Sequence, residues 1–176
     1  MRAFIALAVP EEIKRKIENI QRQIPEFKGK LTEKENLHLT LKFLGEISPA
    51  LFDNVKSRLS AIKFQKLSLS INEIGIFEFQ NNPNIVWLRV SGAEELQKKI
   101  DLGLSDLFKP EERFMSHLTI ARIKYVSNVK RFNEEIKKII VPNISFKSGS
   151  FELMESNLTK QGPSYQILEH YIAREK

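Results

Sequence analysis

The sequence predicts a mixed fold of strands and helices, built from two similar halves that face each other across a cleft. The first observation is a repeated motif. His38-Leu39-Thr40-Leu41 and His117-Leu118-Thr119-Ile120 both read His-apolar-Thr-apolar, and residues 38 and 117 are 79 positions apart. The second is that each copy lies within the same series of expected elements: strand, helix, His-Thr strand, helix and strand. Such a repeat indicates an internal duplication.

The first half follows this series from the N-terminus. Pro10 stands at a helix-start position after an apolar run, and the acids that follow it favour the first turn. Isoleucines then recur at helical spacing as far as the breaker Pro25. The expected elements are a strand at 3–9, a helix at 10–24, the first His-Thr strand at 37–44, a helix at 48–62 and a strand at 67–76.

The second half restarts the series after the loop Asn81-Asn82-Pro83-Asn84. Its expected elements are a strand at 85–90, a helix at 93–107, the second His-Thr strand at 116–123, a helix at 129–140, one or two strands at 144–154 and a last strand at 165–173. We therefore predict one bilobal domain over residues 1–176. Lobe 1 covers about 1–80, lobe 2 covers about 84–156, and the strand at 165–173 braces the two lobes.

The His-Thr pattern indicates chemistry because successive side chains on a strand point to opposite faces. His38 and Thr40 share one face, with Lys42 beyond them, while Leu39, Leu41 and Phe43 point to the core. His117 and Thr119 share a face in the same way. Strict alternation places Arg122 off that face, although a twist or bulge near the strand end would re-aim it.

Two imidazoles and two hydroxyls around one small volume suit a phosphodiester. One neutral His takes a proton from attacking water, and one protonated His gives a proton to the departing oxygen. The hydroxyls of Thr40 and Thr119 donate to the nonbridging oxygens, and Lys42 or Arg122 adds a positive charge. The alternatives are a structural polar pair between the lobes and a zinc site. Zinc is disfavoured by the ligand supply of three His, three Asp and no Cys.

Composition limits the classes of partner. The net charge of +6 favours an anionic partner such as RNA, although a solvated mixed-charge surface has the same composition. The absence of Cys excludes disulfides and thiolate chemistry. No apolar stretch is long enough to span a membrane, and we expect a cytoplasmic monomer with no metal, no cofactor and no obligate protein partner.

Aromatic residues beside the expected strands are candidates for stacking on a nucleobase. Phe77, Phe79 and Trp87 flank the Pro83 loop, and Tyr165 follows a Gly-Pro turn. Core packing is the alternative for each of them. The third histidine, His170, lacks a Thr two positions on, and we expect a surface or packing role for it.

These motifs resemble those of the two-histidine phosphoesterase superfamily, and within it the archaeal and bacterial RNA 2′,3′-cyclic phosphodiesterases, also called 2′-5′ RNA ligases. The resemblance covers nearly the whole chain. It rests on the opening RAFIALAVPEE, the extended motifs HLTLKFLGE and SHLTIAR, GIF followed by PNIVWLRV, and the closing GPSYQILEHY. One departure is Arg89, where a small residue is expected.

The resemblance implies a bilobal α+β fold, with an antiparallel sheet in each lobe, helices outside and a central cleft. It also implies metal-independent hydrolysis of a terminal 2′,3′-cyclic phosphate on RNA to a 2′-phosphate. His38 would be the general acid, His117 the general base, and Thr40 and Thr119 the phosphate ligands. Three other readings stay open: reversible 2′-5′ ligation, another cyclic phosphate such as a small cyclic nucleotide or one derived from ADP-ribose, and an RNA-end-binding module without turnover.

Overall fold

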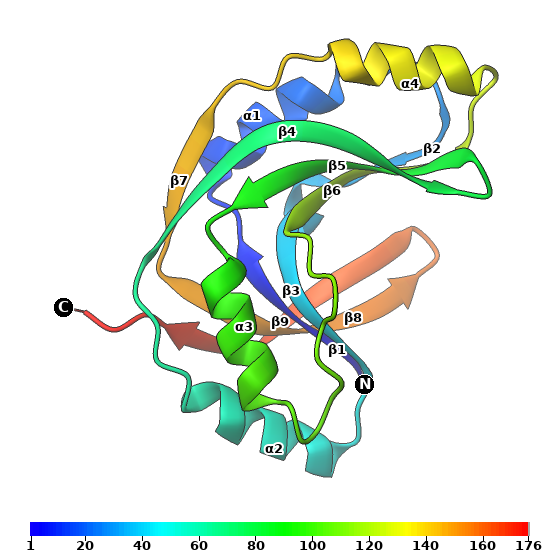
Figure 1. Ribbon diagram of the computed structural model, residues 1–176. Coiled ribbons are helices and arrows are strands. Elements are labelled where there is room, and N and C mark those ends of the chain that lie inside the picture. The colour runs from blue at the N-terminus through cyan, green and yellow to red at the C-terminus, as the bar shows by residue number, and fades with distance from the viewer. Residues whose placement is uncertain (176) are drawn as a thin grey trace.

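The computed structural model describes residues 1–175, which form two antiparallel sheets and four α-helices (Figure 1). The first sheet has the strand order β3-β1-β8-β9, and the second has the order β2-β6-β5-β4-β7. The elements are, in chain order, β1 (Arg2–Ala8), α1 (Glu11–Gln21), β2 (Lys28–Leu31), a 3-10 turn (Lys34–Asn36), β3 (His38–Glu46), α2 (Pro49–Ser60), β4 (Leu67–Phe79), β5 (Asn82–Ser91), α3 (Glu94–Gly103), β6 (His117–Tyr125), α4 (Val129–Lys138), β7 (Ile144–Ser148), β8 (Ser150–Thr159) and β9 (Gly162–Ile172). The predicted α+β class with an antiparallel sheet in each lobe is confirmed.

The two sheets do not coincide with consecutive halves of the chain. Strands β1 and β3 of the first half pair with each other, as do β5 and β6 of the second half. The next long strand of each half crosses to the opposite sheet, so that β4 pairs with β5 and β8 pairs with β1. The two sheets therefore divide the chain differently from the lobe boundaries predicted at 1–80 and 84–156, because strand partners are set by tertiary pairing.

The helices cross over in the same way. Helix α1 follows β1 of the first sheet but contacts β6 of the second, whereas α3 follows β5 of the second sheet but contacts β3 of the first. Helix α4 packs on β4 and β5, and α2 packs on α3 and β9. Figure 1 shows α1 and α4 on the side of the second sheet and α2 and α3 on the side of the first. Each half thus buttresses the other.

The connection between the halves is a tight hairpin in place of the predicted loop at 81–84. Gln80 and Asn81 have φ values of 50° and 61°, the positive values that a two-residue hairpin turn requires. Strand β5 begins at Asn82, and Pro83 is buried within it. Proline has no N–H for the ladder and is tolerated at bulges. The register shift beside Glu78, its partner on β4, meets that requirement.

The last strand returns to the first sheet and does not join the two lobes by pairing. Strand β9 begins at Gly162 and pairs along its length with β8, as the edge strand of that sheet. Its turn contacts the segment after β2, because the Asn36 side chain donates to the Pro163 carbonyl at 3.0 Å. The bracing predicted for residues 165–173 stays a prediction.

The core consists of the apolar faces that the sequence predicts. Strand β1 is buried on both faces from Ala3 to Leu7, and Ile13, Ile17 and Ile20 of α1 are buried as well. Helix α2 begins at a Ser48 cap and α4 at an Asn128 cap, each accepting a hydrogen bond from a backbone N–H in the first turn. Within residues 1–175, none of the helices has the length and apolarity needed to cross a membrane.

Candidate active site

The two His-Thr strands share one backbone design. Along β3 and along β6 the nine residues have the same succession of half-buried, buried and exposed positions. Each strand carries a bulge directly after its Thr. On β3, Thr40 and Lys42 pair with adjacent residues of β1, which leaves Leu41 unpaired between them. On β6, Thr119 and Ala121 pair with adjacent residues of β5, which leaves Ile120 unpaired in the same way. A bulge shifts the alternation of side chains by one residue.

The bulges exchange the predicted places of two cations. Lys42, predicted on the His face, is 2% exposed, and its Nζ lies 2.6 Å from Asp101 Oδ1. Phe43 replaces it on that face and is 68% exposed, although it was predicted in the core. On β6 the buried position is filled by Ala121, and Arg122 is exposed and lines the cleft. The sequence analysis allowed for a bulge that would turn Arg122 toward the His face, and the structure contains such a bulge.

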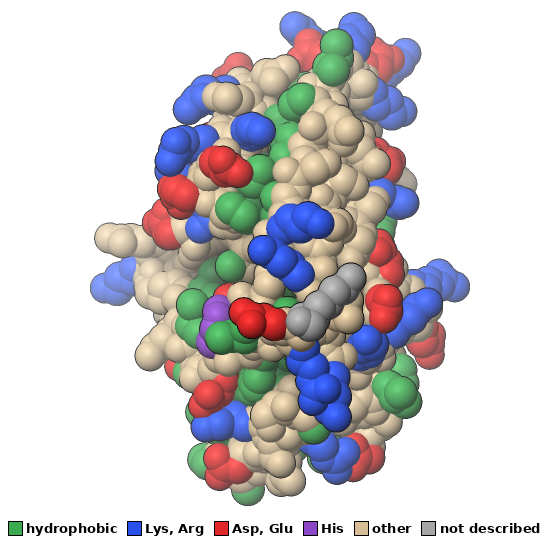
Figure 2. All heavy atoms as spheres, turned by 90° about the vertical axis from the view of Figure 1, so that its left-hand side faces the viewer, with side chains coloured by type: hydrophobic (Ala, Val, Ile, Leu, Met, Phe, Trp, Pro, Cys, Tyr) green, Lys and Arg blue, Asp and Glu red, His purple; other side chains and the backbone are tan. Residues whose placement is uncertain are grey.

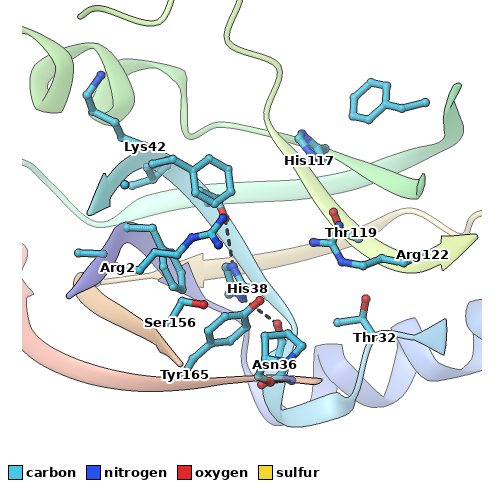
Figure 3. A pocket seen from close by; sticks show the side chains of 18 of the residues that line it. Arg2, Thr32, Asn36, His38, Lys42, His117, Thr119, Arg122, Ser156 and Tyr165 are labelled. Carbon is cyan, nitrogen blue, oxygen red and sulfur yellow. Dashed lines mark hydrogen bonds between the residues drawn. The ribbon is translucent and has the colours of Figure 1, made fainter. Parts of the chain in front are cut away.

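A cleft of about 760 Å³ lies between the sheets and contains both His-Thr pairs. Figure 3 shows Arg122 and Thr119 reaching toward it from β6, with His38, Tyr165 and Ser156 on the opposite wall. The prediction that the two motifs meet is therefore met by the structure. The basic side chains along the wall are those of Arg2, Lys30, Arg113 and Arg122, and the acidic ones are those of Glu33 and Glu111; Lys42 lines the cleft too, but its Nζ is turned to Asp101. By contrast, Figure 2 shows an outer face on which Lys and Arg are intermixed with Asp and Glu.

Both imidazoles are held in the same tautomer by a backbone carbonyl. His38 Nδ1 lies 2.7 Å from the Asn36 carbonyl oxygen, and His117 Nδ1 lies 2.7 Å from the Met115 carbonyl oxygen. Only a protonated Nδ1 can donate to a carbonyl, so in each neutral ring Nε2 carries the lone pair. His38 Nε2 lies 3.0 Å from the Thr40 hydroxyl, which donates to it. Each ring therefore offers Nε2 for proton transfer.

An aromatic ring carried by the same sheet packs edge-on against each imidazole. Tyr165 meets His38 at 4.9 Å between ring centroids and 86° between planes, and Phe77 meets His117 at 5.1 Å and 86°. Each ring is carried on a hairpin, β8–β9 for Tyr165 and β4–β5 for Phe77. Phe4 adds a second ring beside His38, at 5.0 Å. These contacts restrict the rotation of both imidazoles.

The predicted stacking residues have three different fates. Tyr165 lines the cleft, as a stacking role requires. Phe79 is 66% exposed at the end of β4, and it is not among the residues that line the cleft. Trp87 is 8% exposed and packs under Phe77 at 5.4 Å. Gly75 makes room for it, since a Cβ there would lie 2.2 Å from the Trp87 ring. Trp87 therefore packs beneath the site from the core, where it is not accessible to a base, and stacking at Phe79 stays a prediction.

Burial changes the protonation of the first imidazole. Desolvation lowers the pKa of His38 to about 4, and the positive charge of Arg122 acts in the same direction, while the hydrogen bond to the Asn36 carbonyl opposes it. The ring is therefore neutral in the empty cleft at neutral pH. Burial also raises the pKa of Tyr165, so that its hydroxyl stays protonated beside His38.

Sequence reasoning missed several cleft residues. Arg2 and Arg113 lie outside the two His-Thr motifs, and Thr32 and Asn36 follow a short strand, β2, that the hydrophobic pattern does not reveal. The bulge on β6 did leave a signal. Ile120 and Ala121 are adjacent apolar residues followed by Arg122 and Ile123, which shifts the alternation by one. On β3 the same signal is hidden because Lys42 fills the buried position.

The departure at Arg89 does not disturb the cleft. Arg89 stands opposite His117 in the β5–β6 register, but its Nε lies 3.2 Å from Glu73 Oε2 on β4, and both side chains are about half exposed. His170 lies outside the cleft, with Nδ1 3.3 Å from the buried Glu152 carboxylate. No group of three His, Cys, Asp or Glu side chains with the geometry of a metal site occurs among residues 1–175.

Two sheets that present paired His and Thr side chains to one cleft define a phosphoesterase of the two-histidine class. The model of the LigT-like phosphoesterase family matches residues 7–87 and 90–165, and the chain belongs to this family. It is 36% identical over 177 residues to the RNA 2′,3′-cyclic phosphodiesterase of Methanocaldococcus jannaschii, with 97% of this chain and 100% of that protein covered. It is 33% identical to the Archaeoglobus fulgidus protein of the same name, with 96% and 98% covered.

Solved structures show the same fold. The TT0787 protein of Thermus thermophilus superposes with a TM-score of 0.82 at 24% identity, over 99% of this chain and 98% of that one. Escherichia coli LigT complexed with 3′-AMP gives a TM-score of 0.80 at 22% identity, over 99% and 98%. The sequence-based identification of the superfamily is confirmed.

Proposed function

We propose that this chain hydrolyses a terminal 2′,3′-cyclic phosphate on RNA to a 2′-phosphate, by general acid and base catalysis with its two histidines. The observation that carries the proposal is the matched anchoring of His38 and His117, each through Nδ1 to a carbonyl at 2.7 Å, in one cleft. Relatives that span almost the whole chain are named RNA 2′,3′-cyclic phosphodiesterases, and this supports the choice of substrate.

The reaction needs one proton removed and one proton supplied. A water oxygen attacks phosphorus in line with the ribose O3′, and His117 Nε2 takes the proton of that water. The bond between phosphorus and O3′ breaks, and His38 Nε2 gives its proton to O3′, which leaves a 3′-hydroxyl and a 2′-phosphate. Each such proton transfer contributes about 10²- to 10⁴-fold in rate.

The lowered pKa of His38 sets a condition on its role as the acid. A proton donor must be protonated, and in the empty cleft burial holds the pKa of His38 at about 4. A phosphodiester anion beside the ring stabilises the imidazolium and raises that pKa, so substrate and proton bind together. His38 is then charged only when there is a leaving group to protonate.

The remaining polar groups bind the phosphate. The hydroxyls of Thr40 and Thr119 donate to the nonbridging oxygens, where negative charge develops, and the Arg122 guanidinium adds charge-assisted hydrogen bonds. Lys42 is not assigned to the phosphate, because its Nζ is bonded to Asp101 and to the Lys109 carbonyl. Tyr165 is the candidate for contact with the terminal base. The chain acts as a cytoplasmic monomer in this proposal, since one chain supplies both histidines.

The same ring opening, with a 5′-hydroxyl attacking phosphorus in place of water and O3′ again leaving, joins two RNA ends through a 2′-5′ linkage. Water outcompetes the hydroxyl unless both ends are held in the cleft. A second candidate function is hydrolysis of a small cyclic nucleotide. It is favoured by the nucleotide 3′-AMP bound to the structurally similar Escherichia coli LigT.

The test is turnover of a short RNA that ends in a 2′,3′-cyclic phosphate, in the presence of EDTA, with the product assigned by phosphorus NMR. The expected product is the 2′-phosphate, and it is lost in His38→Asn and in His117→Asn. His170→Asn is the matched control, since His170 lies outside the cleft, and it keeps wild-type turnover. Binding of the RNA end without turnover by the wild type would instead indicate a binding module.

A further inference from the structure

The anchor of His117 lies at the end of a long irregular loop. Residues 104–116 connect α3 to β6, and from this loop Arg113 and Met115 line the cleft. The Met115 carbonyl accepts from His117 Nδ1 at 2.7 Å, and the next carbonyl, that of Ser116, accepts from Val90 N at 3.0 Å. The position of this loop therefore fixes the orientation of the His117 ring.

The anchor of His38 is built differently. The Asn36 carbonyl belongs to a short 3-10 turn at 34–36, which is closed by the bond from Leu37 N to the Lys34 carbonyl. The Asn36 side chain also bonds to the Pro163 carbonyl. The first histidine thus has a locally fixed support, whereas long irregular loops need distant contacts to hold one conformation.

Such a contact is present on the loop beneath His117. Lys42 Nζ donates to the Lys109 carbonyl at 2.8 Å and to Asp101 Oδ1 at 2.6 Å. Asp101 Oδ2 accepts from the Glu111 backbone N–H at 2.8 Å, and also from Gln97 Nε2 at 3.0 Å. The ion pair of a β3 lysine and an α3 aspartate thereby holds the loop backbone at residues 109 and 111.

Burial of this pair favours a positional role over a purely stabilising one. Lys42 is 2% exposed and Asp101 12% exposed at the side chain, and desolvation of two such charges offsets most of their attraction. A buried ion pair whose hydrogen bonds are all made does, however, hold the groups that it contacts in one fixed geometry. The equivalent position on β6 is Ala121, so the second half of the chain has no such pair at this place.

We propose that Lys42 and Asp101 are positioning residues for His117, which act by holding the 104–116 loop and through it the Met115 carbonyl. The proposal rests on the catalytic role proposed above for His117. In this arrangement Lys42, which belongs to the first His-Thr motif, holds the loop that leads into the second motif. A residue of the first half of the chain thereby helps to orient His117 of the second half.

The experiment compares Lys42→Met, Asp101→Asn and the double variant with Lys109→Ala as the control. Lys109→Ala removes an exposed side chain and keeps the carbonyl to which Lys42 donates. We expect each single variant to lower kcat by about 10- to 100-fold with KM changed less than about threefold, since a catalytic group displaced by 1 Å loses rate on this scale. The double variant is expected to be no worse than the poorer single variant, and the control to match the wild type.

Three results would overturn the proposal. If Lys42→Met raises KM and flattens the salt dependence of RNA binding while Asp101→Asn does neither, Lys42 binds phosphate. If the single losses multiply in the double variant, the two residues act separately. If both variants lose thermal stability but keep kcat, KM and the NMR signals of the His117 ring, the pair is only structural.

Glu111→Pro tests the same proposal if the Lys42 or Asp101 variants fail to fold. It removes the N–H that donates to Asp101 from an exposed residue and leaves Lys42 in place. We expect lower kcat, faster amide hydrogen exchange at 112–116 and a shifted His117 ring signal, and wild-type values for all three would contradict the proposal. The exchange and NMR readouts need no substrate, so they decide the inference even if the cyclic RNA proves not to be the substrate.

Discussion

Strands β3 and β6 have the same backbone and different chemistry. Both place His and Thr on the cleft face, both bulge at the residue after Thr, and both then bury one residue and expose the next. On β3 these two positions hold Lys42 and Phe43, and on β6 they hold Ala121 and Arg122. Duplicated geometry therefore places the two His-Thr pairs alike, and the two positions after the bulge are where the halves carry different side chains.

The environments of the two histidines differ in a way that suits unequal roles. His38 has two aromatic neighbours, Phe4 and Tyr165, and a hydrogen bond from Thr40 to Nε2. His117 packs against Phe77. Burial lowers the pKa of His38 to about 4, so in the proposed role of general acid its proton has to arrive with the anionic substrate. The enclosed ring is thus the one whose charge is coupled to binding.

The largest expected effect distinguishes the acid from the base. A cyclic substrate with sulfur in place of the bridging O3′ has a thiolate leaving group, which departs without a proton because thiol pKa values are about 8.5. On the natural substrate each of His38→Asn and His117→Asn loses about 10²- to 10⁴-fold in kcat. We expect the sulfur substrate to restore most of the loss in His38→Asn and none in His117→Asn, measured by product formation under single turnover. Restoration in His117→Asn alone would exchange the two roles.

The second effect concerns the exposed position after each bulge. Arg122→Ala removes charge-assisted hydrogen bonds to the phosphate, which are worth about 1.5–3 kcal/mol, or roughly 10- to 150-fold in kcat/KM. We also expect the salt slope of RNA binding to fall by about one. Phe43→Ala at the equivalent position of β3 is the matched control, with a change below about threefold. Equal losses in the two variants would show that the halves do not differ here.

A third effect concerns the support of the second bulge. Gln21 of α1 is 5% exposed, and its Nε2 donates to the Thr32 and Ile120 carbonyls, both at 2.9 Å. Gln21→Leu leaves both acceptors without this donor and is expected to cost about 1–3 kcal/mol of unfolding free energy. Chemical denaturation measures it, with exposed Gln23→Leu as the control. A loss in Gln21→Leu no larger than in the control would contradict this support.

The last effect is a pH dependence of stability, spread over the interval from pH 6.5 to about pH 4. The pKa of His38 is lowered from 6.5 to about 4 on folding, so the unfolded chain binds more protons between these values. Stability from this residue is present above pH 6.5 and is lost as pH falls toward 4, by at most about 1.4 kcal/mol per pH unit. Chemical denaturation at a series of pH values gives the unfolding free energy as a function of pH. We expect it to fall less steeply between pH 6.5 and 4 in His38→Asn than in the wild type. Parallel curves would contradict the lowered pKa.

The sequence predicted those features that depend on local pattern. The His-Thr strands, the four long helices and the meeting of the two motifs in one cleft follow from alternation, helical spacing and the repeat. The sheet membership of β4 and β8 did not follow, because nothing within a strand names its partner. Lys42 was placed on the wrong face because one extra residue reverses every later side chain. Arg122 reaches the cleft through the bulge that the sequence analysis allowed for it, and adjacent Ile120 and Ala121 are the sequence signal of that bulge.

The measurement that tests the central claim most directly is a double-mutant cycle on the two histidines. Single-turnover rates on the cyclic-phosphate RNA are compared for the wild type, His38→Asn, His117→Asn and the double variant, in EDTA. Residues that act as one unit show strongly non-additive losses. The account predicts that each single variant loses most of the activity and that the double variant loses little more. Losses that multiply, or a single variant that keeps wild-type turnover, would contradict a single site made by both halves of the chain.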